Sequence, residues 1–326
     1  MRLLLLLLSL TGFSLAQTNP PRGDIRTVVL SDFNPSYGES VYSLQVARVI
    51  EATTEVWRPD LFLMAGDLVG GQKQSLPDER FAQMWAAFDD TVAAPLRAAN
   101  IPHAAAIGNH DGSSLRTADE TYLFNRERDA ARDYWQQTQA ETQVEFRDEA
   151  DFPFNYSFTF ERVFFVVWDA SSATITDAQT TWLQAEFASQ KAQAAPLRVL
   201  VGHLPLYGVS TEKNEPGEVL TGGDALRQRL ESLGVDLYIS GHHAAYYPAK
   251  VGDLTLLNTG GVGARRLLGS DAPPRSAVTV LDIGLEPLEL RLTTFDTATF
   301  QEIPLASLPE RIDGLNGTLT RIDLAP

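Results

Sequence analysis

The chain has 326 residues, no cysteine, and 26 basic against 42 acidic side chains, which give a formal net charge of −16. Disulfides and thiol chemistry are therefore excluded, and the negative charge disfavours binding to nucleic acid or to anionic membrane surfaces. A chain of this length can bury a large core without covalent cross-links.

The first residues, MRLLLLLLSLTGFSLAQ, combine one arginine, an uninterrupted apolar run and the small residues Ser14 and Ala16. This pattern predicts a signal peptide over residues 1–16, with cleavage after Ala16. An uncleaved N-terminal anchor is the alternative, but the apolar run is short for a membrane span of about 20 residues. We therefore expect a secreted or periplasmic protein without a membrane span after cleavage.

Apolar strands alternate with amphipathic helices along much of the chain. The predicted strands are rich in β-branched residues, as is typical of strands buried on both faces, and cover residues 24–31, 60–65, 102–107, 163–169, 197–202 and 235–240. Apolar residues at helical spacing predict helices over residues 40–54, 78–99, 177–190 and 224–233. This alternation indicates an α/β fold.

Two segments depart from this alternation. Residues 112–151 are polar and contain one helical stretch, so we expect an insertion over one face of the fold. From about residue 254 the pattern changes to short strands without a convincing helix. No linker of Pro, Gly and Ser precedes them, so residues 17–326 are predicted to form a single domain whose C-terminal part is a second sheet or a sheet edge.

Side chains that can bind metal ions follow the predicted buried strands one after another. Ligand sites in α/β folds form at these strand ends. Each residue alone is more often a helix cap or a turn residue, but the combined order would seldom arise by chance. In chain order these side chains are Asp32, Asp67, Asn109, His110, Asp111, His203, His242 and His243.

The motifs that contain these residues are Asp-x-Asn, Gly-Asp, Gly-Asn-His-Asp, Gly-His and Gly-His-His-Ala, spread over residues 24–248. Their order resembles the pattern of the calcineurin-like metallophosphoesterases, a superfamily that includes purple acid phosphatases and cyclic-nucleotide phosphodiesterases. Gly-Asn-His-Asp is the most specific element. The resemblance implies a four-layer α/β/β/α sandwich of two mixed sheets flanked by helices, with two metal ions bridged by one aspartate.

The resemblance also implies which residues bind the better-preserved second ion. Asp67 would bridge the two ions, and Asn109, His203 and His242 would complete the second site. Two imidazoles, an amide oxygen and a carboxylate suit Mn, Fe or Zn.

Two neighbouring residues match the catalytic part of the family pattern. His110 corresponds to the acid that protonates the leaving oxygen or stabilises charge on the phosphoryl group. Asp111 would hold the His110 ring in the useful tautomer.

The first metal site departs from the family pattern. The family's Asp-x-His reads here Asp32-Phe33-Asn34, and the last histidine of Gly-His-x-His is Ala244. This site keeps Asp32, the bridging aspartate and the amide oxygen of Asn34 as candidate ligands. An oxygen-rich site can bind Mg, Mn or Ca, but more weakly than a site with imidazoles, so we expect reduced affinity rather than lost chemistry.

The sequence Gly-His-His-Ala leaves two conformations open. If residues 241–245 run extended, His242 faces the ions, His243 faces away and Ala244 leaves a gap where a ligand would be. A tight turn could instead rotate His243 into that gap. We favour the extended form, with His243 at the rim and bonded to backbone or to substrate.

The sequence contains no motif of the common competing mechanisms: no Gly-x-Ser-x-Gly, no His-Glu-x-x-His and no Gly-x-x-x-x-Gly-Lys-Ser/Thr.

Two further groups of residues could contact a substrate. Arg265 and Arg266 could clamp a phosphate if their loop reaches the site, or could be solvated on the surface. Four tyrosines near the ligand motifs could line a substrate cleft or pack at the bases of loops: Tyr37, Tyr207, Tyr246 and Tyr247.

Two functions are compatible with these observations. The first is an exported metal-dependent phosphoesterase that hydrolyses a small phosphomonoester or phosphodiester by a metal-activated hydroxide. The alternative is a non-catalytic binding protein of the same fold with a degraded first site, which Asn34 and Ala244 suggest. We favour the enzyme, because His110 has little purpose in a pure binding protein. The sequence does not define the substrate, the native metals or the oligomeric state.

Overall fold

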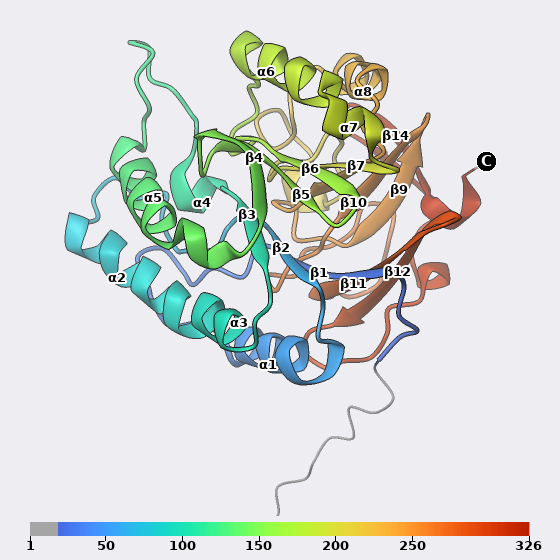
Figure 1. Cartoon of the computed structure of the whole chain (residues 1–326), viewed down its shortest axis with the longest axis horizontal. Coiled ribbons are helices and arrows are strands. Elements are labelled where there is room, and N and C mark those ends of the chain that lie inside the picture. The colour runs from blue at the N-terminus through green and yellow to red at the C-terminus, as the bar shows by residue number, and fades with distance from the viewer. Residues whose placement is uncertain (1–18, 326) are drawn as a thin grey trace, which may run out of the picture.

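The computed structural model describes residues 19–325. Its strands form two mixed sheets that lie face to face between two layers of helices (Figure 1). The predicted four-layer α/β/β/α sandwich is therefore confirmed. The predicted signal peptide, residues 1–16, lies outside the described residues. Among the described residues, no helix has the length and apolar character that crossing a membrane requires.

The first sheet has five strands in the order β12-β11-β1-β2-β3. Its three parallel strands are β1 (Ile25–Leu30), β2 (Leu61–Ala65) and β3 (His103–Ala106). They correspond to the first three strands predicted from the sequence. All their residues are buried, as expected of strands covered on both faces. The C-terminal hairpin of β11 (Ala277–Leu285) and β12 (Leu288–Asp296) joins this sheet antiparallel to β1.

The second sheet has nine strands in the order β13-β14-β9-β10-β8-β7-β6-β5-β4. Its centre is parallel and consists of β6 (Val163–Val167), β7 (Leu197–Val201), β8 (Leu237–Ser240) and β10 (Leu254–Asn258). Antiparallel strands flank this centre: β4 (Glu145–Asp151), β5 (Asn155–Phe160), β9 (Tyr247–Val251), β13 (Arg311–Gly314) and β14 (Gly317–Arg321).

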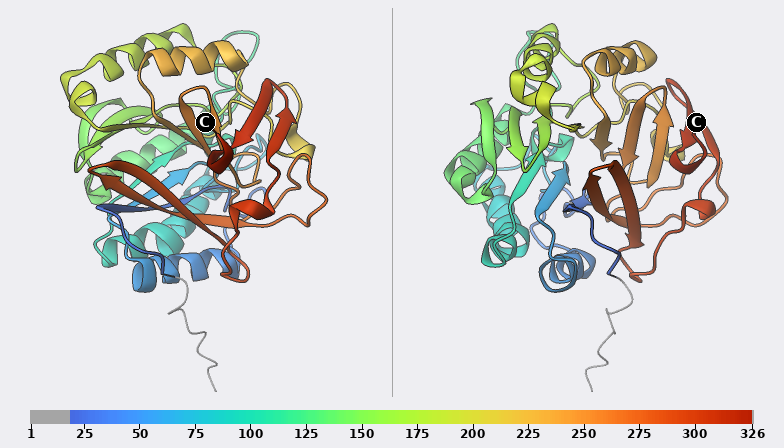
Figure 2. Two further views of the ribbon diagram at one scale, coloured as in Figure 1. Left: turned by 90° about the vertical axis from the view of Figure 1, so that its right-hand side faces the viewer. Right: turned by 45° about the vertical axis from the view of Figure 1, so that its right-hand side comes forward.

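Helices cover the outer face of each sheet, as the two further views in Figure 2 show. The first sheet is covered by α1 (Leu44–Ala52), η2 (Thr53–Trp57), α2 (Asp78–Phe88), η3 (Asp89–Ala93) and α3 (Ala94–Ala98), with α5 (Asn125–Thr138) beside α2. The second is covered by α6 (Asp177–Ala188), α7 (Gln190–Ala194) and α8 (Gly223–Ser232). Short turns of helix are α4 (Asn109–Gly112), η4 (Gln139–Thr142), η5 (Thr211–Lys213), η6 (Leu305–Ser307) and η7 (Ile322–Leu324).

The alternation of side chains along the second sheet explains how one sheet serves two apolar layers. In β6, Val163, Phe165 and Val167 belong to the core that also contains the first sheet. The intervening Phe164 and Val166 pack instead with the helices α6 to α8. A continuous apolar run in the sequence therefore corresponds to a strand buried on both faces.

The C-terminal strands do not form a sheet of their own. The hairpin β11–β12 completes the first sheet, whereas β13 and β14 extend the second. The polar segment 112–151 contains the predicted helix as α5 and also β4, which pairs with β5 at the edge of the second sheet. Both segments are thus built into the two sheets.

The pairing of β1 with β11 contains a buried ion pair. The Arg26 side chain is 2% exposed, and its Nε donates to Asp282 Oδ1 over 2.9 Å. A second bond joins Arg26 Nη2 to Asp282 Oδ2 over 3.1 Å. Two strands far apart in the sequence, β1 and β11, are therefore joined in the first sheet by a forked, buried contact.

Candidate metal centre

Four predicted ligands from the carboxyl ends of four strands lie together, and we call Asp67, Asn109, His203 and His242 the four-residue centre. His203 Nε2 lies 2.9 Å from Asn109 Oδ1 and 3.2 Å from Asp67 Oδ1. His242 Nδ1 lies 2.8 Å from Asn109 Oδ1 and 3.3 Å from His203 Nε2. Potential ligand atoms of Asp67, His203 and His242 all lie within 4.8 Å of one another.

Contacts behind the four-residue centre orient its donor atoms inward. His203 Nδ1 donates to the carbonyl oxygen of Ala65 over 2.8 Å, so its Nε2 is the nitrogen directed at the centre. Asn109 Nδ2 donates to Gln72 Oε1 over 2.8 Å, which directs the Asn109 oxygen toward the imidazoles. Outer contacts of this kind fix the tautomer and orientation of metal ligands.

Two glycines allow the ligand loops to approach one another. Gly66 has a φ of +85°, and a Cβ there would lie 2.5 Å from the His203 ring. A Cβ at Gly108 would overlap the Asp67 carboxylate. Glycine is therefore required at position 66 by close packing and by backbone conformation, and at position 108 by close packing alone.

Asp111 has a different role from the one predicted. Its carboxylate accepts hydrogen bonds from the backbone amides of Asp67, Leu68, Val69 and Gly108 over 2.7 to 2.9 Å. Among the described residues, no hydrogen bond joins it to the His110 ring. The prediction that Asp111 sets the His110 tautomer is thus wrong: the carboxylate braces the loops after β2 and β3, because these loops leave four amides without other acceptors.

His110 lies beside the four-residue centre. Its backbone nitrogen donates to Asp67 Oδ1 over 2.9 Å, and its ring Nε2 is 3.9 Å from Asp67 Oδ2. The ring packs on Tyr37, with 4.9 Å between centroids. Its Nδ1 is buried and has no hydrogen-bond partner within the described part of the chain. The ring lines the cavity next to the centre, so its position suits proton transfer to a bound molecule.

The predicted first site contains carboxylates but few other ligands. Asp32 is 8% exposed, and its Oδ2 accepts a 3.0 Å hydrogen bond from the His242 amide as well as one from the Ser31 hydroxyl. The Asn34 side chain donates through Nδ2 to the carbonyl oxygen of Pro35 over 3.2 Å. Asp32, Asn34 and Ala244 all line the same cavity. The structure thus places the predicted first-site residues together without an imidazole from position 244.

The backbone of Gly-His-His-Ala is not extended, contrary to our expectation. His242 has a φ of +64° and Ala244 a φ of +43°, and the His243 amide donates to the Gly241 carbonyl over 2.7 Å. Gly241 packs closely against the Asp32 carboxylate, and a Cβ there would lie 2.7 Å from Asp32 Oδ2. The turn still directs His242 to the centre.

His243 faces away from the centre and is fully buried, rather than at a rim. Its Nδ1 accepts from the amides of Val209 and Ser210 over 3.1 and 3.2 Å. Its Nε2 donates to the carbonyl oxygen of Glu218 over 3.0 Å. Both ring nitrogens are therefore occupied by backbone groups, and His243 anchors the loop that follows β7.

That loop brings two charged residues to the centre that the sequence analysis did not identify. His242 Nε2 lies 2.6 Å from Glu218 Oε2, a contact that turns Nδ1 toward the centre. Lys213 Nζ lies 2.8 Å from the same Glu218 oxygen. The residues are ten and fifteen positions beyond His203 in a polar segment, TEKNEPGE, whose composition is typical of a solvated loop.

In the four-residue centre, burial and neighbouring charges shift the pKa values of the ligands in opposite directions. Burial alone would lower the pKa of His203, but the carboxylates of Asp67 and Asp32 outweigh it and raise the pKa to about 9. Burial would raise the pKa of Asp67, yet His203 and His110 hold it below its usual range. Burial lowers the pKa of His242. Because His203 is protonated at neutral pH, a metal ion that binds there must displace a proton.

The cavity beside the centre has a volume of about 820 Å³. Arg265 lines it and donates through Nη1 to the His242 carbonyl oxygen over 3.1 Å, whereas Arg266 is exposed and does not line it. Of the four tyrosines, Tyr37 lines the cavity; the other three are buried in the core, namely Tyr207, Tyr246 and Tyr247.

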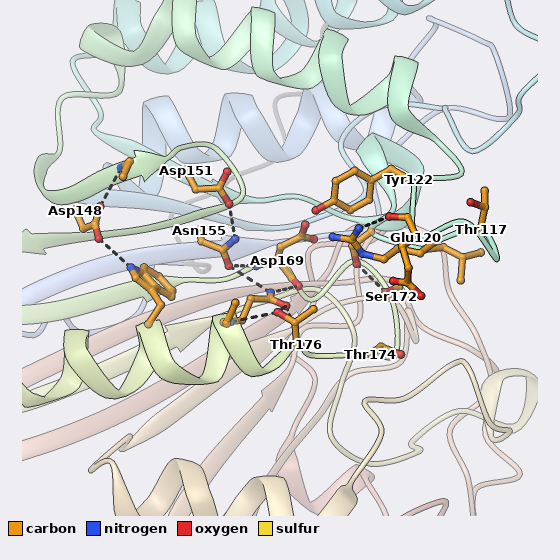
Figure 3. Close-up of a pocket in the computed structure, with 17 residues that line it drawn as sticks. Thr117, Glu120, Tyr122, Asp148, Asp151, Asn155, Asp169, Ser172, Thr174 and Thr176 are labelled. Atoms are coloured by element: carbon orange, nitrogen blue, oxygen red, sulfur yellow. Dashed lines mark hydrogen bonds between the residues drawn. The ribbon is translucent and has the colours of Figure 1, made fainter.

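A second cavity of about 630 Å³ shares no lining residue with the first (Figure 3). Three of the four carboxylates that line it are already paired: Asp151 accepts from Asn155 over 2.7 Å, and Asp148 accepts from the Trp182 indole over 2.9 Å. Asp169 accepts from Arg128 over 2.7 Å. These side chains bond to one another rather than converging on a common point, so the second cavity has no comparable donor cluster.

Sequence comparison identifies the family of the chain that carries the four-residue centre. The sequence profile described as calcineurin-like phosphoesterase matches residues 25–246. The chain belongs to the calcineurin-like phosphoesterase family. The predicted resemblance is thus confirmed, and the matched range contains the whole four-residue centre. No curated protein matches the chain in sequence.

Solved structures support the calcineurin-like fold. A purple acid phosphatase from yellow lupin (Lupinus luteus) seeds aligns with a TM-score of 0.59 at 16% identity, over 86% of this chain and 52% of the lupin chain. A dimetal phosphatase from Danio rerio aligns with a TM-score of 0.53 at 14% identity, over 83% and 95% of the two chains. GAP50 of Plasmodium, an anchor in the inner membrane complex, gives 0.51 at 15% identity, over 86% and 87%. The chain thus spans about half of the lupin protein.

Proposed function

We propose that this protein is an exported metal-dependent phosphoesterase that hydrolyses a small phosphate ester in the cavity beside the four-residue centre. The observation that carries this proposal is the inward orientation of four donor atoms, each from a different strand end. Family membership supports the reaction class. The lupin and zebrafish structures, by name a purple acid phosphatase and a dimetal phosphatase, share the fold.

The donor set fits a transition-metal ion. Two imidazole nitrogens, one amide oxygen and one carboxylate are typical ligands of Mn, Fe or Zn. Hydrogen bonds from the far nitrogen of each ring direct Nε2 of His203 and Nδ1 of His242 toward the same point. An ion bound there would supply Lewis acidity and would lower the pKa of a bound water, so that it could act as a nucleophile near neutral pH.

The side chains around the cavity suit the remaining steps of hydrolysis. The oxygen of water forms a bond to phosphorus, the bond from phosphorus to the leaving oxygen breaks, and the leaving oxygen takes up a proton. His110 is the group placed to deliver that proton. Asp111 contributes indirectly, because it holds the loop that carries Asp67 and the helix turn that carries His110.

The lack of a ligand side chain at position 244 is the observation behind the second candidate function. This is a non-catalytic binding protein that retains the fold and one ion. Position 244 offers no ligand, and Asp32 has few neighbouring donors for a second ion. The two functions differ in turnover rather than in fold, so an activity measurement separates them.

The test uses metal-free protein reloaded with Mn²⁺, Fe²⁺, Zn²⁺ or Mg²⁺ and two substrates, p-nitrophenyl phosphate and bis-p-nitrophenyl phosphate. We expect metal-dependent turnover of at least one substrate. Asp67→Asn should lose both the bound ion and turnover, whereas the same substitution at Asp151 in the second cavity should retain both. A tightly bound ion without turnover in any metal would instead establish the binding protein.

Export is tested separately. If residues 1–16 are a signal peptide, protein secreted or released from the periplasm should begin at Gln17. N-terminal sequencing of protein from each fraction measures this directly. Protein that keeps Met1 and stays with the membrane would indicate an uncleaved anchor.

A further inference from the structure

The loop between β7 and α8 places a lysine ammonium beside the four-residue centre. Lys213 ends the short helix η5, and its side chain is 16% exposed. Its Nζ lies 2.8 Å from Glu218 Oε2 and 3.0 Å from His242 Nε2. A lysine is seldom buried to this extent without a partner, and here Glu218 holds it against the His242 ring.

The same cavity contains the carboxylates of the predicted first site. Lys213 lines it together with Asp32, Asp67 and Ala244. The cavity thus contains the anionic ligands of a metal site and a fixed cation held by Glu218 and His242, but no imidazole from position 244.

We propose that Lys213 takes the place of the first-site metal ion. The chain then binds one ion at the four-residue centre, and the Lys213 ammonium neutralises an oxygen of the phosphoryl group in the cavity. This inference rests on the proposed function, because it assigns a role within the same site.

The physical chemistry of phosphoryl transfer supports this assignment. The reaction requires positive charge around the oxygens of the transferring group, and an ammonium supplies that charge as well as hydrogen-bond donors. A divalent ion at the first site would be repelled by an ammonium in the same cavity. Glu218 contacts both His242 and Lys213, so one carboxylate positions a metal ligand and the cation that replaces the second ion.

The experiment measures ion count and phosphate binding in the full-length mature protein. Ion count is determined by elemental mass spectrometry after dialysis against Mn²⁺ or Zn²⁺. Affinity for inorganic phosphate is measured by calorimetry on the ion-loaded protein. The variants are Lys213→Met, which removes the charge, and Lys213→Arg, which keeps it. Lys191→Met, at an exposed position in α7, is the matched control.

We expect one ion per chain in the wild type. Lys213→Met should not weaken ion binding, but should weaken phosphate binding by about 10- to 100-fold, the range for one lost charge-assisted hydrogen bond. Lys213→Arg should recover part of that loss, and Lys191→Met should match the wild type. If Lys213 only held Glu218 against the ligand His242, Lys213→Met should weaken ion binding as well as phosphate binding.

Three results would overturn the inference, and they are distinguishable. Two ions per wild-type chain with normal turnover would remove the role of Lys213 and leave the proposed function intact. One ion with phosphate binding unchanged by Lys213→Met would do the same. No bound ion and no turnover in the wild type would remove the proposed function, and the role of Lys213 with it.

Discussion

Replacing Asp111 by asparagine tests the brace between the loops after β2 and β3. In the wild type each carboxylate oxygen accepts two backbone amides. Asparagine keeps one oxygen and places an NH₂ group at the position of the other, so two amides lose their acceptor. Hydrogen bonds to a charged group contribute about 1.5–3 kcal/mol each, so the expected loss is about 3–6 kcal/mol. That is a large part of the roughly 5–15 kcal/mol that stabilises a folded protein.

The assay is urea unfolding followed by tryptophan fluorescence, with excess chelator to remove any stabilisation by metal ions. Burial, and then the charge of Asp67, raise the pKa of Asp111 to about 7, so pH 8.5 ensures that the carboxylate is ionised. Asp119→Asn, at an exposed position, is the control and should change stability by less than about 0.5 kcal/mol. A loss below about 1 kcal/mol at Asp111, together with a shifted pH profile of turnover, would show that Asp111 acts through His110 instead.

Three further changes test other parts of the structure. His110→Ala should leave ion content unchanged but lower turnover by about 10²–10⁴-fold. The loss should be smaller for p-nitrophenyl phosphate, because its leaving group needs little protonation. Full activity of the variant would remove His110 from the mechanism. Ala244→His should add an imidazole to the first site and, when combined with Lys213→Met to remove the opposing charge, should raise the Zn²⁺ count per chain; an unchanged count in the double variant would show that position 244 does not face this site. Burial lowers the pKa of His103 to about 4, so its neutral form stabilises the fold above pH 6.5 and this contribution is lost as pH falls toward 4. Between pH 7 and pH 4.5, His103→Gln should therefore lose about 2–3 kcal/mol less stability in urea unfolding than the wild type, and equal losses would contradict this.

The sequence predicted those strands whose burial leaves a continuous apolar signal. β2 reads LFLMA and is buried at every residue, so its position and the ligand at its end follow from local composition. β4 reads EFRDEAD and is largely exposed at a sheet edge, so no alternation marks it as a strand. Its pairing with β5, rather than its own side chains, determines that it is extended.

The site was predictable where ligands directly follow strands and unpredictable where tertiary contacts direct the chain. His203 and His242 come immediately after β7 and β8, so the strand ends fix their positions. His242 has a positive φ, and its amide donates to Asp32, a residue more than two hundred positions away that no local pattern connects to it. Lys213 reaches the centre through a long loop, whose path no periodic pattern in the sequence describes.

The position of β1 between β2 and β11 has a consequence for the order in which the chain can fold. As synthesis proceeds, β1, β2 and β3 emerge early, yet one edge of β1 has no partner until residues 277–285 have been made. Until then Arg26 has no Asp282 to neutralise it. A fragment that stops before Ala277 should expose this apolar strand edge and aggregate, because an unpaired edge is a template for other strands. The first sheet therefore cannot be completed until most of the chain has been made, and until then the free edge of β1 must be protected from pairing with other chains.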